Sequence, residues 1–94
     1  MENKIFAILY KMSGQKYTFQ YGSPETNHYV DVTDIVYRRH VVRNKVKFSA
    51  DEDLDVYFGD PVPGLPKQLQ VRPVGSLDVC AFFWQRAPIL FSTE

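Results

Sequence analysis

The sequence lacks the residues and motifs around which small enzymes and disulfide-rich proteins are built. Among 94 residues it has one cysteine, Cys80, so no intrachain disulfide can form, and its histidines are His28 and His40. GxSxG, HExxH, the phosphate-binding loop and paired-cysteine zinc spacings are absent. Cys80 lies in an apolar run, where we expect a buried structural thiol rather than a nucleophile. We therefore expect a protein that is not an enzyme and has no cofactor and no metal site.

Long apolar runs and net charge are also missing. The apolar run near the start ends at Lys11, which makes it too short for a signal-peptide core or a membrane span. We therefore expect an intracellular, cytoplasmic protein without a membrane partner. Eleven basic and eleven acidic side chains give a formal net charge of zero, so the overall field of a dedicated nucleic-acid binder is not expected.

Aromatic and aliphatic residues are plentiful and set the fold class. They make up 45% of the chain, and aromatic residues alone 15%, enough for one core without disulfides. Residues 15–21 alternate, with Tyr17, Phe19 and Tyr21 on one face, the period of a half-buried strand. A nearly continuous apolar run predicts a buried strand over residues 4–12. Further strands are predicted over residues 28–32, 45–49, 54–58, 67–72, 77–84 and 89–91. We predict one all-β domain over residues 1–94, a small antiparallel β-sandwich or barrel of seven to eight short strands.

The orientation of several side chains follows from the same alternation. Val30 and Val32 are expected to point inward from one strand, and Leu54, Val56 and Phe58 from another. A helical turn over residues 35–37, capped by Thr33 or Asp34, is expected to stay short because β-branched residues surround it.

The segment GDPVPGLP must be a loop, because proline lacks an amide donor and restricts its predecessor. We assign Gly59, Asp60, Pro61 and Gly64 a structural role. Both glycines are expected in conformations that a side chain would hinder, and Asp60 is expected to accept bonds from loop amides. The loop is therefore predicted to be rigid.

The order of these motifs resembles a β domain of uncharacterised function that is found at the C-terminus of some J-domain (DnaJ-like) proteins and as small stand-alone proteins. The matching positions, within residues 4–72, are Asp31-Val32-Thr33, Gly59-Asp60-Pro61, Pro63-Gly64, Lys67, Leu69 and Val71. The C-terminal third departs from the pattern, with Pro73 where the strand would continue. The resemblance implies an all-β fold with an interaction or accessory role, and it transfers no catalytic residue.

Two neighbouring segments carry opposite charge. The basic candidates for polyanion binding are Arg38, Arg39, Arg43, Lys45 and Lys47. Tyr37 could add a base-stacking ring to this stretch. The simpler interpretation is cross-strand pairing with the acidic segment 51–60. That segment could also suggest calcium, but it lacks the EF-hand spacing, which favours a solvated acidic turn over residues 51–53.

Phe82, Phe83 and Trp84 form the most concentrated aromatic run. In a strand, Phe83 points opposite to Phe82 and Trp84, so one face is core. The simpler interpretation is that a second sheet or a loop of the same domain covers the other face, and the alternative is a cover from another subunit. Phe82 and Trp84, with Tyr57, are our candidate interface residues. We predict a non-catalytic protein-interaction or structural module that self-associates, as a homodimer, or docks to a protein partner. The alternative is a ligand-binding β domain, for nucleic acid or another polyanion through the basic stretch, or for carbohydrate through exposed aromatic residues.

Overall fold

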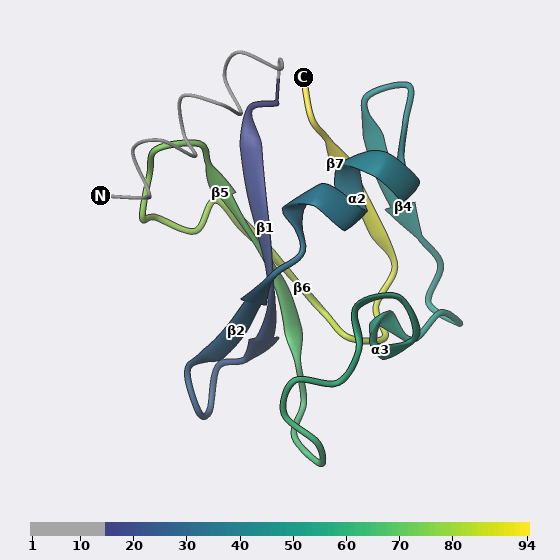
Figure 1. Ribbon diagram of the computed structural model, residues 1–94. Helices are drawn as coiled ribbons and strands as arrows, with labels where there is room; N and C mark the ends of the chain where they lie inside the picture. The colour runs from purple at the N-terminus through teal and green to yellow at the C-terminus, as the bar shows by residue number, and fades with distance from the viewer. Residues whose placement is uncertain (1–14) are drawn as a thin grey trace.

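The computed structural model, which describes residues 15–94, has seven strands in two antiparallel sheets and two short helices (Figure 1). The elements in chain order are β1 (Tyr17–Ser23), β2 (His28–Asp31), α2 (Thr33–Arg39), β3 (Val41–Val42), β4 (Lys45–Phe48), α3 (Leu54–Phe58), β5 (Gln68–Pro73), β6 (Ala81–Trp84) and β7 (Ile89–Ser92). One sheet has the order β2-β1-β5-β6 and the other β3-β4-β7. The predicted all-β fold of seven to eight strands is confirmed, as two sheets that do not close into a barrel. The strand predicted over residues 4–12 lies outside the described residues.

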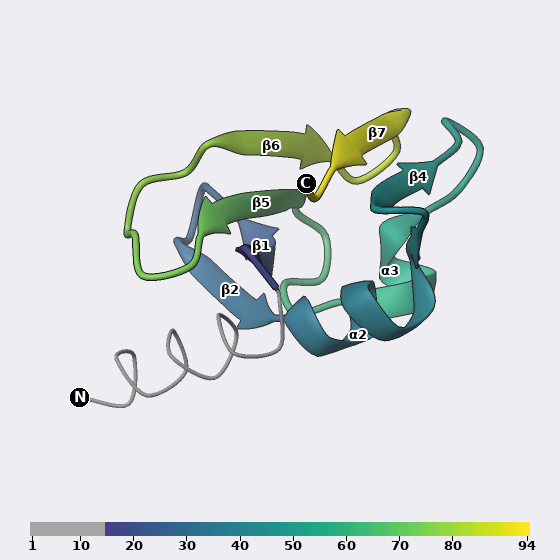
Figure 2. The same ribbon diagram turned by 90° about the horizontal axis from the view of Figure 1, so that it is seen from above.

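The two sheets and the two helices enclose one core. Figure 2 shows the four-stranded sheet on one side, with α2, α3 and β4 on the other. The core residues are Phe19, Tyr21, Val32, Val36, Val46, Phe48, Leu54, Leu69, Val71 and Ile89. They come from both sheets and both helices, each contributing about 1.5–3 kcal/mol on burial. No helix within residues 15–94 is long and apolar enough to cross a membrane.

The junction between β1 and α2 is held by one buried threonine. The Phe19 amide donates to Thr33 Oγ1 over 2.8 Å, and the Thr33 hydroxyl donates to the Phe19 carbonyl over 3.3 Å. The predicted cap of α2 is wrong, since Val32 is the N-cap residue and forms no side-chain bond. Asp31 Oδ1 accepts from the Thr33 amide over 2.9 Å instead. The helix is short, as predicted.

Residues 54–58 form a helix, so the strand predicted there is wrong. Leu54 is buried and Val56 is exposed, rather than both pointing inward. Positions four residues apart share a face in a helix as well as in a strand, so five residues do not distinguish the two periods. The residues at the two ends of the segment favour a helix over a strand. Asp53 Oδ1 accepts from the Asp55 amide over 3.0 Å, and Gly59 ends the helix with a φ of 79°.

Three further predictions are wrong at the margins of the four-stranded sheet. Val30 is exposed, because β2 is an edge strand that extends beyond the core. Residues 77–80 are not in a strand, since β6 begins at Ala81. Cys80 is exposed rather than buried, because it precedes the part of β6 that covers the core.

Candidate functional site

The loop between α3 and β5 is built around backbone conformations that suit glycine. Gly59 and Gly64 have φ angles of 79° and 83°, as predicted for positions that a side chain would hinder. Asp60 Oδ1 accepts from the Val62 amide over 3.3 Å, also as predicted. Pro61 lies between these residues, and the segment forms neither helix nor strand.

Lys67 holds this loop from inside. Its side chain is 3% exposed, and its ammonium donates to the carbonyls of Leu65 and Val62 over 2.8 and 3.3 Å. The same nitrogen lies 2.9 Å from Asp60 and 3.5 Å from Asp55. Burial alone would lower the pKa of Lys67, but the bond to Asp60 and the charges of both carboxylates raise the pKa above its usual value. A buried ammonium thus ties the loop to α3.

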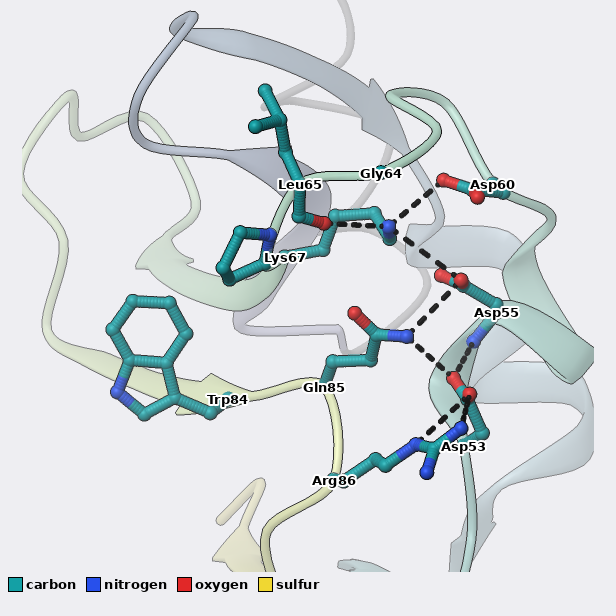
Figure 3. Close-up of a pocket in the computed structure, with 10 residues that line it drawn as sticks. Asp53, Asp55, Asp60, Gly64, Leu65, Lys67, Trp84, Gln85 and Arg86 are labelled. Atoms are coloured by element: carbon teal, nitrogen blue, oxygen red, sulfur yellow. Dashed lines mark hydrogen bonds and ion pairs between the residues drawn. The ribbon is translucent and has the colours of Figure 1, made fainter.

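Polar side chains around Lys67 extend the network to the end of β6 (Figure 3). Gln85 Nε2 donates to Asp53 over 2.9 Å and to Asp55 over 3.1 Å. Arg86 Nη2 lies 2.9 Å from Asp53, and the Tyr21 hydroxyl donates to Asp55 over 2.6 Å. The bond from Gln85 leads the causes that lower the pKa of Asp53, followed by the Asp55 amide. The predicted pairing of these acids with the basic stretch is wrong, because their partners are Lys67, Gln85 and Arg86, which lie outside that stretch.

Sequence reasoning missed this network, which lines an open pocket of about 620 Å³ beside Trp84. The carboxylates of Asp53, Asp55 and Asp60 are all occupied by protein donors. The part of the chain that the structure describes has no cluster of three metal-ligating side chains. The arrangement therefore locks α3, the loop and the β6–β7 turn together, and what it leaves available at the surface is the ring of Trp84.

Phe82 and Trp84 lie together on the outer side of β6. Phe82 is 54% exposed and Trp84 is 46% exposed. Their rings meet edge to face, with the ring centroids 6.4 Å apart. Phe83 points the other way and contacts Phe91, with centroids 6.3 Å apart. The predicted split of the aromatic run between a core face and an outer face is confirmed.

β6 is also an edge strand, with β5 as its neighbour in the sheet and no strand on its other side among residues 15–94. Figure 2 shows it at the periphery of the four-stranded sheet. The Gln85 amide donates to the Lys67 carbonyl over 2.9 Å. In an antiparallel pair the bonded residues alternate, so the backbone groups of Phe82 and Trp84 point away from β5. The Trp84 carbonyl accepts from Ala87 over 3.2 Å, within the turn.

Polar side chains cover the outer face of the sheet next to these rings. Phe82 lies opposite Gln70 and Trp84 opposite Gln68. Gln70 Nε2 donates to Gln68 over 3.2 Å and to the Tyr29 hydroxyl over 2.8 Å. The two exposed rings therefore form an apolar ridge along the free edge, beside a network of amides that bond to one another.

Tyr57 is not part of this ridge. Its ring lies on α3 against His40, with centroids 4.7 Å apart, and against Phe48 at 5.4 Å. Its hydroxyl donates to Glu52. That bond is the main cause that raises the pKa of Tyr57, and the main cause that lowers the pKa of Glu52. The structure thus brings together two of the three predicted interface residues.

Four of the five basic candidates line a second cavity of about 630 Å³, bounded by the end of α2, the β3–β4 hairpin and β7. The lining residues are Arg39, His40, Val42, Arg43, Lys45, Lys47 and Leu90. Arg38 is not among them, because it pairs with Asp34 over 2.6 Å one helical turn earlier. Tyr37 points into the protein, where its hydroxyl accepts from the Tyr17 amide over 3.2 Å, so it offers no stacking ring here.

No protein-family model, curated protein or solved structure matches the chain, and the resemblance to the J-domain-associated β domain stays a prediction.

Proposed function

We propose that this chain is a non-catalytic protein-interaction module that self-associates through the free edge of β6. The observation that carries the proposal is the coincidence of two features in the same residues. Phe82 and Trp84 expose their rings on one face, and the same residues direct backbone groups towards the open edge. An open edge favours addition of another strand, and exposed aromatic rings favour protein contacts.

A second copy fits this edge in an antiparallel arrangement about a two-fold axis at Phe83. Phe82 of one copy then lies opposite Trp84 of the other. In each pair the Trp84 amide donates to the Phe82 carbonyl, and the Phe82 amide donates to the Trp84 carbonyl, whose second lone pair already accepts from Ala87. Each cross-strand aromatic pair contributes about 0.5–1.5 kcal/mol beyond the area it buries. The two four-stranded sheets become one continuous sheet, and the ridges of the two copies lie side by side on the same face, where their rings contact each other.

Carbohydrate binding is less well supported at the same rings. A sugar site needs polar groups that are free to bond hydroxyls next to the aromatic platform. Both donor hydrogens of Gln70 are already used within the sheet, and Arg72 bonds Gln20 and Gln70. A rigid polar face beside an apolar edge suits a strand partner better than a sugar ring.

The test is the molar mass of the wild type and of Phe82→Lys, measured by light scattering during size-exclusion chromatography over a range of concentrations. Lysine on an edge strand opposes strand pairing, and Phe82 lies outside the core, so the variant should stay folded and become monomeric. Leu77→Lys is the matched control, because Leu77 is exposed in the loop before β6 and should leave the dimer intact. A wild type that stays monomeric at high concentration would refute the proposal.

A further inference from the structure

The cavity beside the β3–β4 hairpin gathers cations that the protein does not neutralise. Within residues 15–94, no carboxylate lies within 4.0 Å of Arg39, Arg43, Lys45 or Lys47. Arg38, Lys67 and Arg86 differ, since each of them has such a carboxylate partner. Lys45 and Lys47 share the outer face of β4, between the buried residues of that strand. Four unneutralised cations around one cavity repel one another, so an anionic occupant would be stabilised there.

Arg43 reaches the rim of this cavity through an unusual turn. Arg43 and Asn44 connect β3 to β4 with φ angles of 53° and 62°. This two-residue turn favours glycine or asparagine at both positions, and a long side chain there carries a conformational cost on the order of 1 kcal/mol. Glycine at position 43 would suit the hairpin better, whereas arginine supplies a cation to the cavity.

The rest of the lining distinguishes between classes of anion. Val42 and Leu90 are 68% and 67% exposed and lie among the cations. No aromatic side chain other than His40 lines the cavity, so a stacking platform for nucleic-acid bases is missing from this site. An occupant that carries both carboxylates and apolar side chains matches the lining. The volume of the cavity is typical of ligand pockets.

His40 also lines this cavity, and its ring packs against Phe48 and Tyr57. Its Nε2 atom is buried and has no hydrogen-bond partner among the described residues. Burial lowers the pKa of His40, which favours the neutral ring, although the charge of Glu52 acts in the opposite direction. The positive charge around the cavity therefore comes from Arg39, Arg43, Lys45 and Lys47.

We propose that this cavity binds an acidic segment of a partner protein, whose carboxylates pair with Arg39, Arg43, Lys45 and Lys47 and whose apolar side chains contact Val42 and Leu90. This surface lies on the three-stranded sheet, so it is separate from the proposed self-association edge on β6. Occupation of one site does not require the other.

The test uses a short fluorescein-labelled peptide in which glutamate alternates with leucine, followed by fluorescence anisotropy at low ionic strength. Lys45→Glu with Lys47→Glu should raise the Kd at least tenfold, because two attractive contacts become repulsive. Arg38→Glu with Lys16→Glu is the matched control, since it changes net charge equally at exposed positions outside the cavity. The control should change the Kd less than about threefold, and circular dichroism verifies that both variants are folded.

Two further probes separate the components of the proposal. A peptide with serine in place of leucine should bind more weakly, and Leu90→Ser should remove this difference between the peptides. Absence of peptide binding, or an equal loss in the control variant, would overturn the proposal. Tighter binding of single-stranded DNA of the same charge than of the peptide would also overturn it and assign the cavity to nucleic acid.

Discussion

Replacement of Lys67 by methionine tests whether the buried ammonium holds the loop that precedes β5. Methionine retains most of the side-chain volume but loses the contacts to two carbonyls and to Asp55 and Asp60. Removing one partner of a buried ion pair costs about 3–5 kcal/mol. The two carboxylates are 21% and 37% exposed, so water recovers part of that loss. We expect the free energy of unfolding to fall by about 2–4 kcal/mol, which lowers the Tm by about 10–30 °C in a domain of this size.

The assay is urea unfolding followed by far-UV circular dichroism, with Lys16→Met as the matched control. Lys16 is exposed, so its replacement should change the free energy of unfolding by no more than about 0.5 kcal/mol. Asp60→Asn combined with Lys67→Met should show a coupling of at least about 1 kcal/mol, because the two side chains bond each other. A Lys67→Met protein as stable as the control would refute the reasoning.

Three further outcomes follow from single contacts. Gly22→Ala should abolish the fold, as judged by lost circular dichroism signal, because a Cβ there would lie 1.9 Å from the His28 carbonyl oxygen. Gly64→Ala should lower the Tm, since its φ of 83° disfavours a side chain; an unchanged Tm would make the loop a passive linker. The lowered pKa of Asp53 stabilises the fold above the usual aspartate pKa, and this is lost as pH falls through the lowered value. Asp53→Asn should therefore flatten the acid limb of a stability–pH profile, and a parallel profile would contradict this.

The strands that the sequence predicted best are those in which apolar and polar residues alternate strictly. Residues 17–21 and 45–48 alternate between core and surface in the structure as the pattern predicts. Residues 54–58 were misassigned, because Leu54 and Phe58 fit both periods and the deciding signals were the cap at Asp53 and the glycine that follows. Short segments of this kind need their ends considered before their period.

The aromatic ridge was predictable and the polar network was not. Alternation within three residues placed Phe82 and Trp84 on one face, and it needs no knowledge of the rest of the fold. The network joins Asp55 to Lys67 and Gln85, which are brought together by the tertiary arrangement of a helix, a loop and a turn. A lysine between a proline-rich loop and a strand was the available signal, although nothing in the sequence names its partners.

The distance between two copies of Cys80 tests self-association through β6 most directly. Cys80 is the one cysteine in the sequence and it is exposed, so a nitroxide label attaches there without mutation. With the two-fold axis at Phe83, six residues of extended chain separate the two labelled positions, which places their Cα atoms roughly 20 Å apart. Electron–electron double resonance should show a peak near that distance, and Phe82→Lys should remove it. A peak at a clearly different distance, or no dipolar coupling at concentrations where the wild type is dimeric, would contradict the account.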